Sequence, residues 1–107
     1  MKKGTIKVSL FYPKGKTKEF DMDYYLNKHV PWVSGLLGDA ILGATIEKGL
    51  AGGAPDAPAP YVALGNIYFS SVESFQNSFG PHVEAIMADM PNYTDAMPII
   101  QISEVLV

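Results

Sequence analysis

Residues 61–69 have the sequence YVALGNIYF, in which only Asn66 is strongly polar. Aromatic and β-branched residues of this kind favour a β-strand, where successive side chains point to opposite faces of the sheet. A sheet with one face in water alternates apolar and polar side chains. This strand is therefore predicted to be covered on both sides. Its two faces carry Tyr61, Ala63, Ile67 and Phe69, and Val62, Leu64 and Tyr68, respectively.

Five further elements follow from the pattern on either side of this strand. Strands are predicted at residues 5–12, 43–48 and 98–107 from their apolar residues and the glycines and prolines that flank them. Helices are predicted at 22–37 and 70–89, the second interrupted by Gly80 and Pro81. The order strand, helix, strand, strand, helix, strand in 107 residues predicts one domain, residues 1–107. Right-handed crossovers fold it into an α+β, ferredoxin-like βαββαβ domain: a four-stranded antiparallel sheet with two helices on one face.

Two helices on one side leave the other face of the sheet without cover. The strand at 98–107 is also apolar on both faces, with Ile99 opposed by Ile100 and Ile102. Exposing such a surface would leave a large apolar patch on a monomer. A second copy of the same sheet, related by a two-fold axis, is the simplest cover. We therefore expect a homodimer that pairs through the sheet face.

The ends of the helices and one long loop are also marked in the sequence. The first helix is predicted to have Asp21 as its N-cap and the second to have Ser70, three residues before Glu73. Residues 49–60 are rich in glycine and proline, and a loop of this length either closes over a ligand or covers a sheet edge. The apolar stripe of the first helix consists of Met22, Leu26, Val30, Val33 and Leu37.

The composition excludes several functions. All eight basic residues are lysines and the net charge is −3, so the bidentate contacts of arginine with phosphate and guanine are missing and no nucleic-acid partner is expected. The absence of cysteine excludes disulfides, thiolate catalysis and thiolate metal ligands. No apolar run approaches the roughly 18 residues of a membrane span, and no signal-peptide core follows the N-terminus. We therefore expect a cytoplasmic protein with no membrane partner.

The residues that carry chemistry lie around His29. Asp21, Tyr25 and His29 are four residues apart, so on a helix they form one column beside the apolar stripe. A neutral imidazole in an apolar cavity can accept or donate a proton. Pro31 cannot donate to the carbonyl of Asn27 and opens that turn, which frees a carbonyl beside the imidazole. The alternative is a partly buried structural histidine bonded to a carbonyl, next to a tolerated kink. The only other histidine, His82, is in a distant segment, so the pair forms no metal motif and no metal is expected.

The same segment resembles a known family. Residues 20–31, FDMDYYLNKHVP, closely resemble the motif of the EthD family, small proteins named for ethyl tert-butyl ether degradation. Three further segments, 79–82, 88–94 and 98–103, look similar, so the resemblance covers nearly the whole chain. It implies the dimeric α+β barrel superfamily, in which two ferredoxin-like sheets pack face to face. This agrees with strands that are apolar on both sides.

The resemblance also implies a range of activities. The superfamily includes cofactor-free monooxygenases, muconolactone isomerases, polyketide cyclases and haem-degrading enzymes, and some of its members use histidine and tyrosine as acid–base groups. For this chain it implies a protein that acts on a small apolar aromatic or lactone-like compound, or assists its degradation, without a cofactor. The reaction would be of the monooxygenase, isomerase, cyclase or dehydratase type. His29 would move the proton, and Tyr25 or Tyr12 would orient it or stabilise an enolate-like oxygen; Asp21 is a third candidate unless it serves only as a helix cap.

Further residues are expected to contact the ligand, and two other functions stay open. The expected contacts are Tyr12, Val33, Trp32, Tyr68 and His82, although the aromatic residues among them are equally suited to the core and His82 to a helix start at the surface. One alternative function is a dimeric module that binds a ligand without turnover. The other is a haem-binding protein with His29 as the axial ligand, which the absence of arginine disfavours. Membership of a fold does not decide between them.

Overall fold

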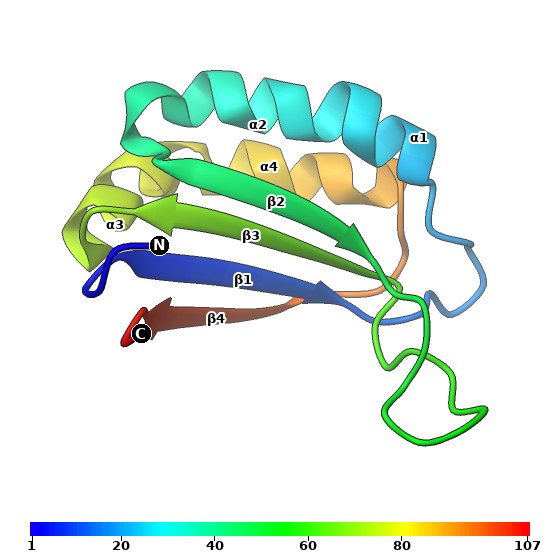
Figure 1. The fold of residues 1–107 in the computed structure, drawn as a ribbon. Coiled ribbons are helices and arrows are strands. Elements are labelled where there is room, and N and C mark those ends of the chain that lie inside the picture. The colour runs from blue at the N-terminus through cyan, green and yellow to red at the C-terminus, as the bar shows by residue number, and fades with distance from the viewer.

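The computed structural model describes all 107 residues and contains every element expected from the sequence (Figure 1). The strands are β1 Ile6–Tyr12, β2 Gly43–Lys48, β3 Ala63–Phe69 and β4 Ile99–Glu104. The first helical segment consists of α1 Met22–Tyr24, the π-turn η1 Tyr25–His29, α2 Val30–Leu37 and the 3₁₀ turn η2 Gly38–Ala40. The second consists of α3 Val72–Phe79, η3 Gly80–His82, α4 Val83–Asp89 and η4 Met90–Asn92.

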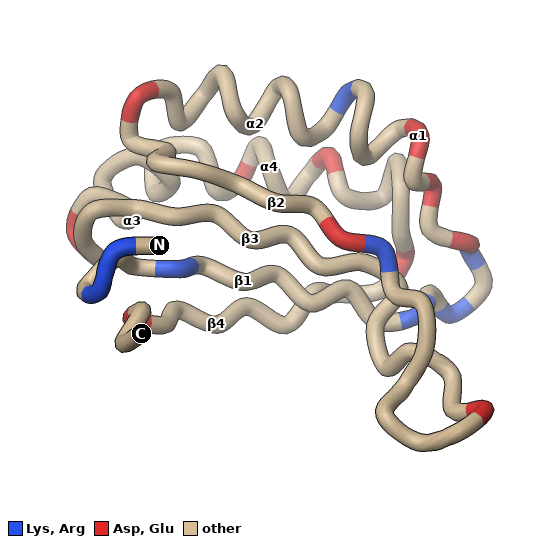
Figure 2. Tube along the Cα trace, viewed as in Figure 1, with Lys and Arg blue, Asp and Glu red and all other residues tan.

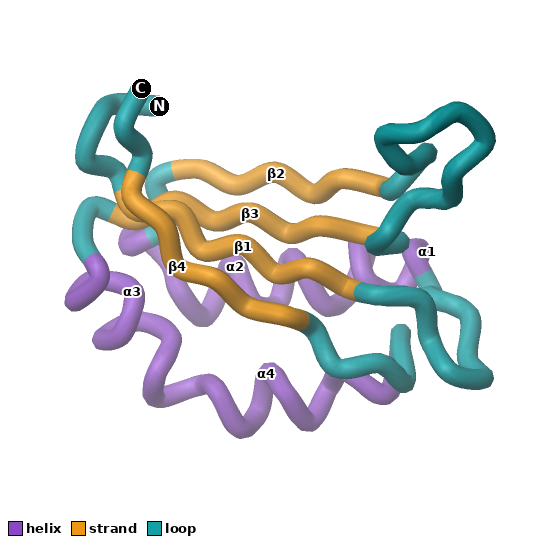
Figure 3. The backbone as a smooth tube through the Cα atoms, turned by 90° about the horizontal axis from the view of Figure 1, so that it is seen from below, coloured by secondary structure: helices purple, strands orange, loops and turns teal.

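The four strands form one antiparallel sheet in the order β2-β3-β1-β4. Both helical segments lie on one face of this sheet, and the other face carries no helix (Figures 1 and 3). The two ends of the chain lie close together at one end of the sheet (Figure 3). The predicted α+β, ferredoxin-like fold is therefore confirmed.

Two clusters of side chains fill the space between the helices and the sheet. The first is aliphatic except for one ring and consists of Val8, Val33, Leu37, Phe69 and Ile86. The second lies under the π-turn and is built on Tyr12, Tyr25 and Tyr93, with Ala63 and Met90. The three tyrosine rings have centroids 5.0, 5.4 and 5.8 Å apart and meet at tilted or edge-on angles, as aromatic pairs prefer. The second cluster therefore brings three phenols into the interior.

The open face of the sheet carries a row of polar side chains across its middle. Ser9 Oγ donates to Asn66 Oδ1, and Asn66 Nδ2 donates to Thr45 Oγ1, each at 3.1 Å. Ser9 and Asn66 are buried even in the single chain. This face is thus less uniformly apolar than the pattern of residues 61–69 predicts. The strand pairing places Phe11, Leu64 and Ile99 on one side of the row, and Tyr68 beside Lys7 and Ser103 on the other.

The alternation predicts that Tyr61 and Ala63 share a face, but in the structure they do not. The chain bends before β3 begins, so the side-chain alternation of the strand does not reach residue 61. The Tyr61 ring packs against Phe11, with centroids 5.2 Å apart. Phe11 points to the open face because its neighbour Tyr12 is buried under the helices.

One predicted helix cap is confirmed and the other is wrong by one residue. Asp21 Oδ1 accepts the N–H of Tyr24 at 3.0 Å, as an N-cap does. In the second segment the cap is Ser71, whose Oγ accepts the N–H of Ser74 at 2.9 Å. Ser70 lies one residue too early, because the helix begins at Val72.

Charged residues lie mainly in the loops and at the ends of the elements (Figure 2). One of them, Asp95, ties the loop after β1 to the segment before β4. Its carboxylate accepts the backbone N–H groups of Lys16, Thr17 and Lys18 at 2.7, 2.9 and 3.0 Å. These bonds, that of Thr17 first, hold the pKa of Asp95 well below its usual range. None of the helices combines the length and the apolar character that crossing a bilayer requires.

Candidate active site

The first helical segment widens into a π-turn at Tyr25–His29, where the N–H of Val30 bonds to the carbonyl of Tyr25, five residues back. Pro31 follows directly and has no N–H for the ordinary bond to the residue four positions earlier. Single π-turns in helices frequently occur at functional sites. Tyr25 and His29 are both buried here, with their rings stacked at 5.7 Å and 18°. The widened turn therefore directs two polar rings into the interior.

A carboxylate from the second helical segment holds His29. The imidazole Nδ1 lies 2.8 Å from Oδ2 of Asp89, the last residue of α4. The other oxygen of Asp89 accepts the Tyr24 hydroxyl at 2.8 Å and the Asn92 amide at 2.9 Å. Burial alone would raise the pKa of Asp89, but the hydrogen bonds from His29, Tyr24 and Asn92 hold it below its ordinary value. Asp89 is therefore ionised at neutral pH, and Nδ1 is the ring nitrogen that carries the proton and donates it.

Two tyrosines continue the network on the other side of the imidazole. The Tyr93 hydroxyl lies 3.4 Å from His29 Nε2 and 3.1 Å from the Tyr12 hydroxyl. With the proton on Nδ1, Nε2 is the acceptor and Tyr93 the donor. Burial raises the pKa of Tyr12, Tyr25 and Tyr93 well above the ordinary value of 10.0. All three side chains are therefore neutral phenols at neutral pH.

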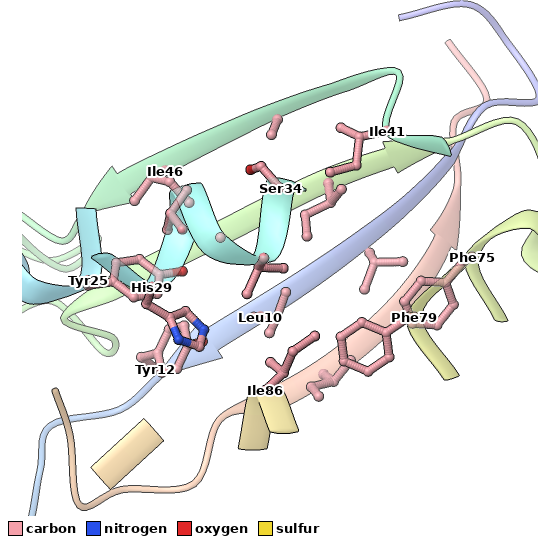
Figure 4. A pocket seen from close by; sticks show the side chains of 17 residues that line it. Leu10, Tyr12, Tyr25, His29, Ser34, Ile41, Ile46, Phe75, Phe79 and Ile86 are labelled. Carbon is pink, nitrogen blue, oxygen red and sulfur yellow. The ribbon is translucent and has the colours of Figure 1, made fainter. Parts of the chain in front are cut away.

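An apolar cavity lies between the helices and the sheet (Figure 4). The cavity has a volume of about 70 Å³. His29, Tyr12 and Tyr25 lie together at one end, and the rings of Phe75 and Phe79 lie at the other (Figure 4). No lysine, aspartate or glutamate is among the lining residues. The cavity thus has one polar end and a long apolar body.

Gly65 of β3 forms part of the cavity floor under Tyr25. A Cβ atom at this position would lie 2.8 Å from the Tyr25 hydroxyl, closer than real Cβ contacts allow. The Tyr25 hydroxyl therefore occupies the space that any other residue at position 65 would fill. This glycine allows a phenol to point into the cavity along the sheet surface.

This arrangement supports proton transfer inside a water-poor cavity. An ionised carboxylate orients the imidazole and stabilises its protonated form, as in other histidine acid–base sites. Neutral phenols beside it supply hydrogen-bond donors for a developing oxyanion. No group of three or more His, Cys, Asp or Glu side chains comes together as a metal site would need.

The structure brings four of the residues predicted for the site together. Tyr12, Tyr25, His29 and Val33 all line the cavity. His29 and Tyr25 come from the π-turn, Val33 from α2 and Tyr12 from the end of β1. Four residues from three elements, which meet only in the folded chain, therefore line the same cavity.

The other four predicted residues lie outside the cavity. The Asp21 carboxylate caps the N-terminus of α1. Trp32 is 39% exposed, and its ring and that of His29 meet edge-on with centroids 6.0 Å apart. Tyr68 points to the open face of the sheet, between its neighbours Phe69 and Ile67, which face the helices. His82 ends η3 and is half-buried away from the lining residues.

Sequence reasoning missed Asp89 and Tyr93, the direct partners of His29. They lie 60 and 64 residues from it along the chain, so no local spacing links them. Both belong to the segment 88–94 that resembles the EthD family, and this was the one signal that could have found them. Tyr24 and Asn92, which bind the second oxygen of Asp89, were missed for the same reason.

Comparison with known proteins gives consistent results. The family model described as EthD domain matches residues 13–97. An EthD-like protein from Ralstonia eutropha is similar in structure, with 42% identity, a TM-score of 0.89, and coverage of 99% of this chain and 96% of that chain. An ethyl tert-butyl ether (EthD) family protein from Bacillus halodurans shares the fold, with 16% identity, a TM-score of 0.73, and coverage of 95% and 99%. No curated protein matches the sequence significantly.

Proposed function

Because this chain belongs to the EthD family, we propose that it binds a small, neutral, largely apolar organic compound in the cavity and moves a proton to or from it through His29. The observation that carries this proposal is the His29–Asp89 pair, with an Nδ1 to Oδ2 distance of 2.8 Å, at the end of a cavity that no lysine, aspartate or glutamate lines. An ionised carboxylate beside an apolar region is costly unless it is hydrogen-bonded. The position of Asp89 and His29 next to the cavity is therefore a reason to assign the pair a chemical role.

The lining of the cavity limits the class of ligand. Carboxylates and phosphates would lose their hydration without gaining a cationic partner there. An apolar ring or chain can lie against Phe75 and Phe79 while one oxygen reaches Tyr12, Tyr25 or His29 at the other end. An aromatic ketone, a phenol or a lactone has this shape and polarity.

Proton removal next to a carbonyl is the reaction that this site supports best. The C–H bond breaks, its electron pair forms an enolate, and the proton passes to the His29–Asp89 pair. The enolate oxygen needs a donor, and the Tyr25 hydroxyl over Gly65 lies on the cavity floor where it can supply one. Cofactor-free monooxygenation, isomerisation, cyclisation and dehydration can all begin with such an anion, so this step does not select among them.

The geometry gives less support to the haem-binding alternative. An axial histidine offers a free ring nitrogen to iron. In His29, Nδ1 is bonded to Asp89, and Nε2 faces the Tyr93 hydroxyl at 3.4 Å. Haem binding would require Tyr93 to move away from the imidazole.

We also propose that two copies pair through the open face of the sheet. Phe11, Leu64 and Ile99 lie on one side of the buried polar row and Tyr68 on the other, and Ile99 is 53% exposed in the single chain. Sedimentation at micromolar concentration should give a dimer, and Leu64→Lys, which places a charge in the contact, should give a folded monomer. Val83→Lys, an apolar-to-lysine change on α4, is the matched control and should remain dimeric. A wild-type monomer would refute the pairing.

The proton-transfer proposal can be tested with β-tetralone, a neutral bicyclic ketone that has acidic protons next to its carbonyl. In D₂O, NMR would follow both its binding and the exchange of those protons. Wild type should accelerate the exchange, and His29→Ala should lose about 100-fold or more of that acceleration while still binding the ketone. His82→Ala, the matched control outside the cavity, should behave as wild type.

Two other outcomes would decide against this function. Binding without exchange in the wild type would favour the non-catalytic binding module. Failure of β-tetralone to bind at millimolar concentration would overturn the assignment of the cavity to neutral apolar ligands.

A further inference from the structure

Both ring nitrogens of His29 are already in use, which raises the question of how a ligand reaches the imidazole. Nδ1 donates to Asp89 at 2.8 Å, and Nε2 accepts from Tyr93 at 3.4 Å. Tyr93 is fully buried and is not among the cavity-lining residues. A ligand in the cavity therefore finds the nitrogen that could take its proton already facing a phenol.

The hydrogen bonds around the ring all point in the same direction. Because Tyr93 donates its only proton to His29 Nε2, its oxygen must accept the proton of the Tyr12 hydroxyl, 3.1 Å away. Beyond the ring, Nδ1–H donates to Asp89. The donors thus run from Tyr12 through Tyr93 and His29 to a carboxylate. At the start of this chain, Tyr12 lines the cavity.

We propose that Tyr12 is the group that exchanges a proton with the ligand and that Tyr93 passes the proton on to His29. This inference rests on the proposed acid–base function. When a ligand C–H bond breaks, its proton goes to the Tyr12 oxygen, the Tyr12 proton goes to the Tyr93 oxygen, and the Tyr93 proton goes to His29 Nε2. The ligand is left as an enolate, both phenols are neutral again, and the imidazolium is paired with Asp89. No oxidant or reductant is needed.

The burial of the phenols favours a concerted shift over separate steps. An isolated phenolate at Tyr12 or Tyr93 would be an uncompensated charge in an apolar region, which is costly. Moving three protons together leaves charge only on the enolate and on the His29–Asp89 pair. Asp89 is the partly open end of the chain, with its side chain 20% exposed, so exchange with water can restore the starting state from there.

The opposite assignment, direct transfer from the ligand to His29, predicts a different response to one substitution. Tyr93→Phe removes the hydroxyl and leaves Nε2 without its partner. If the ligand reacts directly with the imidazole, this change exposes the accepting nitrogen and the exchange rate should stay the same or rise. If the proton travels through Tyr93, the same change cuts the chain and the rate should fall.

The experiment measures α-proton exchange of β-tetralone in D₂O with Tyr93→Phe, Tyr12→Phe and, as the matched control, Tyr61→Phe. Tyr61 packs against Phe11 and does not line the cavity. We expect the first two variants to lose about 100-fold or more of the rate, with unchanged binding of the ketone. Tyr61→Phe should stay within a few-fold of wild type. The Nδ1–H signal of His29 in the proton NMR spectrum should persist in all three, which shows that the pair with Asp89 is intact.

The outcomes separate this inference from the function on which it rests. If His29→Ala abolishes exchange while Tyr93→Phe preserves or raises it, the relay is wrong and His29 acts directly. If Tyr12→Phe alone loses the rate, Tyr93 is not a carrier and the inference also fails. If wild type shows no exchange, the proposed function fails first. Should Tyr93→Phe not fold, as judged by circular dichroism, Tyr12→Phe decides whether a phenol is required.

Discussion

Replacing Gly65 by alanine tests whether the Tyr25 hydroxyl really fills the space above this glycine. The added Cβ would lie 2.8 Å from that hydroxyl, 3.6 Å from Ile46 Cδ1 and 3.9 Å from Leu10 Cδ1. Ordinary contact begins at 3.4 Å, so the two carbons fit but the hydroxyl is about 0.6 Å too close. Tyr25 is buried and packs against other rings, so it cannot turn away freely. Overpacking of this kind costs about 1–3 kcal/mol of unfolding free energy.

The clash between the added Cβ and Tyr25 disappears when the Tyr25 hydroxyl is removed, so a double substitution is the strictest test of this prediction. In the Tyr25→Phe background, Gly65→Ala should be neutral or slightly stabilising, because alanine reduces the entropy of the unfolded chain. The two substitutions should therefore couple by about 1–2 kcal/mol. Urea unfolding of wild type, the two single variants and the double variant, all at one protein concentration, measures this coupling. Additive free energies would refute the placement of the hydroxyl.

A second glycine provides the control. Gly35 lies on the exposed side of α2, and a Cβ there would meet nothing within 4 Å. Gly35→Ala should stabilise the protein by about 0.5–1 kcal/mol, since glycine is a poor residue inside a helix. The same chemical change should thus have opposite effects at positions 65 and 35. Gly65→Ala should also slow β-tetralone exchange, because it displaces the proposed oxyanion donor.

Two other predictions follow from the carboxylates. Asp21→Ala should lower the unfolding free energy by about 1 kcal/mol through loss of the helix cap. It should leave the rate of β-tetralone exchange within twofold of wild type. A large loss of exchange would indicate that Asp21 takes part in the reaction. The pKa values of Asp89 and Asp95 are lowered on folding, so the unfolded chain binds more protons as the pH falls below the ordinary value of 3.8. Stability should therefore be full above about pH 5 and decline as the pH falls through the two lowered pKa values. Urea titrations from about pH 6 to pH 2 would check this: Asp95→Asn should flatten the decline, and a wild-type profile without any decline would contradict both assignments.

Much of the fold could be predicted because its signals are local. The alternation of residues 5–12 and 43–48, the glycines and prolines between elements, and the helical spacing of Val30, Val33 and Leu37 each reflect a short-range preference. The predictions that were wrong depend on geometry that a short stretch of sequence does not show. Leu26 was placed on the buried stripe and is 43% exposed, because the π-turn changes the phase of the helix between it and α2. The polar row on the open face was missed because Ser9, Thr45 and Asn66 meet only through strand pairing.

The site residues that could be predicted are likewise those with a local signal in the sequence. His29 and Tyr25 could be found because a spacing of four residues places side chains on one side of a helix. Asp21 shared that spacing but lies at the helix start, where the unsatisfied N–H of Tyr24 holds its carboxylate. Asp89 and Tyr93 come from the far end of the chain, and nothing in their local sequence indicates which ring they will meet. The carboxylate that matters for His29 is therefore the one that only the tertiary structure could identify.

The π-turn also permits a change in the length of this chain. Such a turn is a helical turn that holds one surplus residue, and here Asn27 and Lys28 within it are exposed. Deleting either residue would leave the Val30 N–H bonded to the carbonyl of Tyr25, now four positions back, so the helix on both sides keeps its phase. Tyr25 and His29 would then be three residues apart and still on one side of the helix. A chain shortened by one of these two surface residues should therefore fold with the phenol and the imidazole still facing inward.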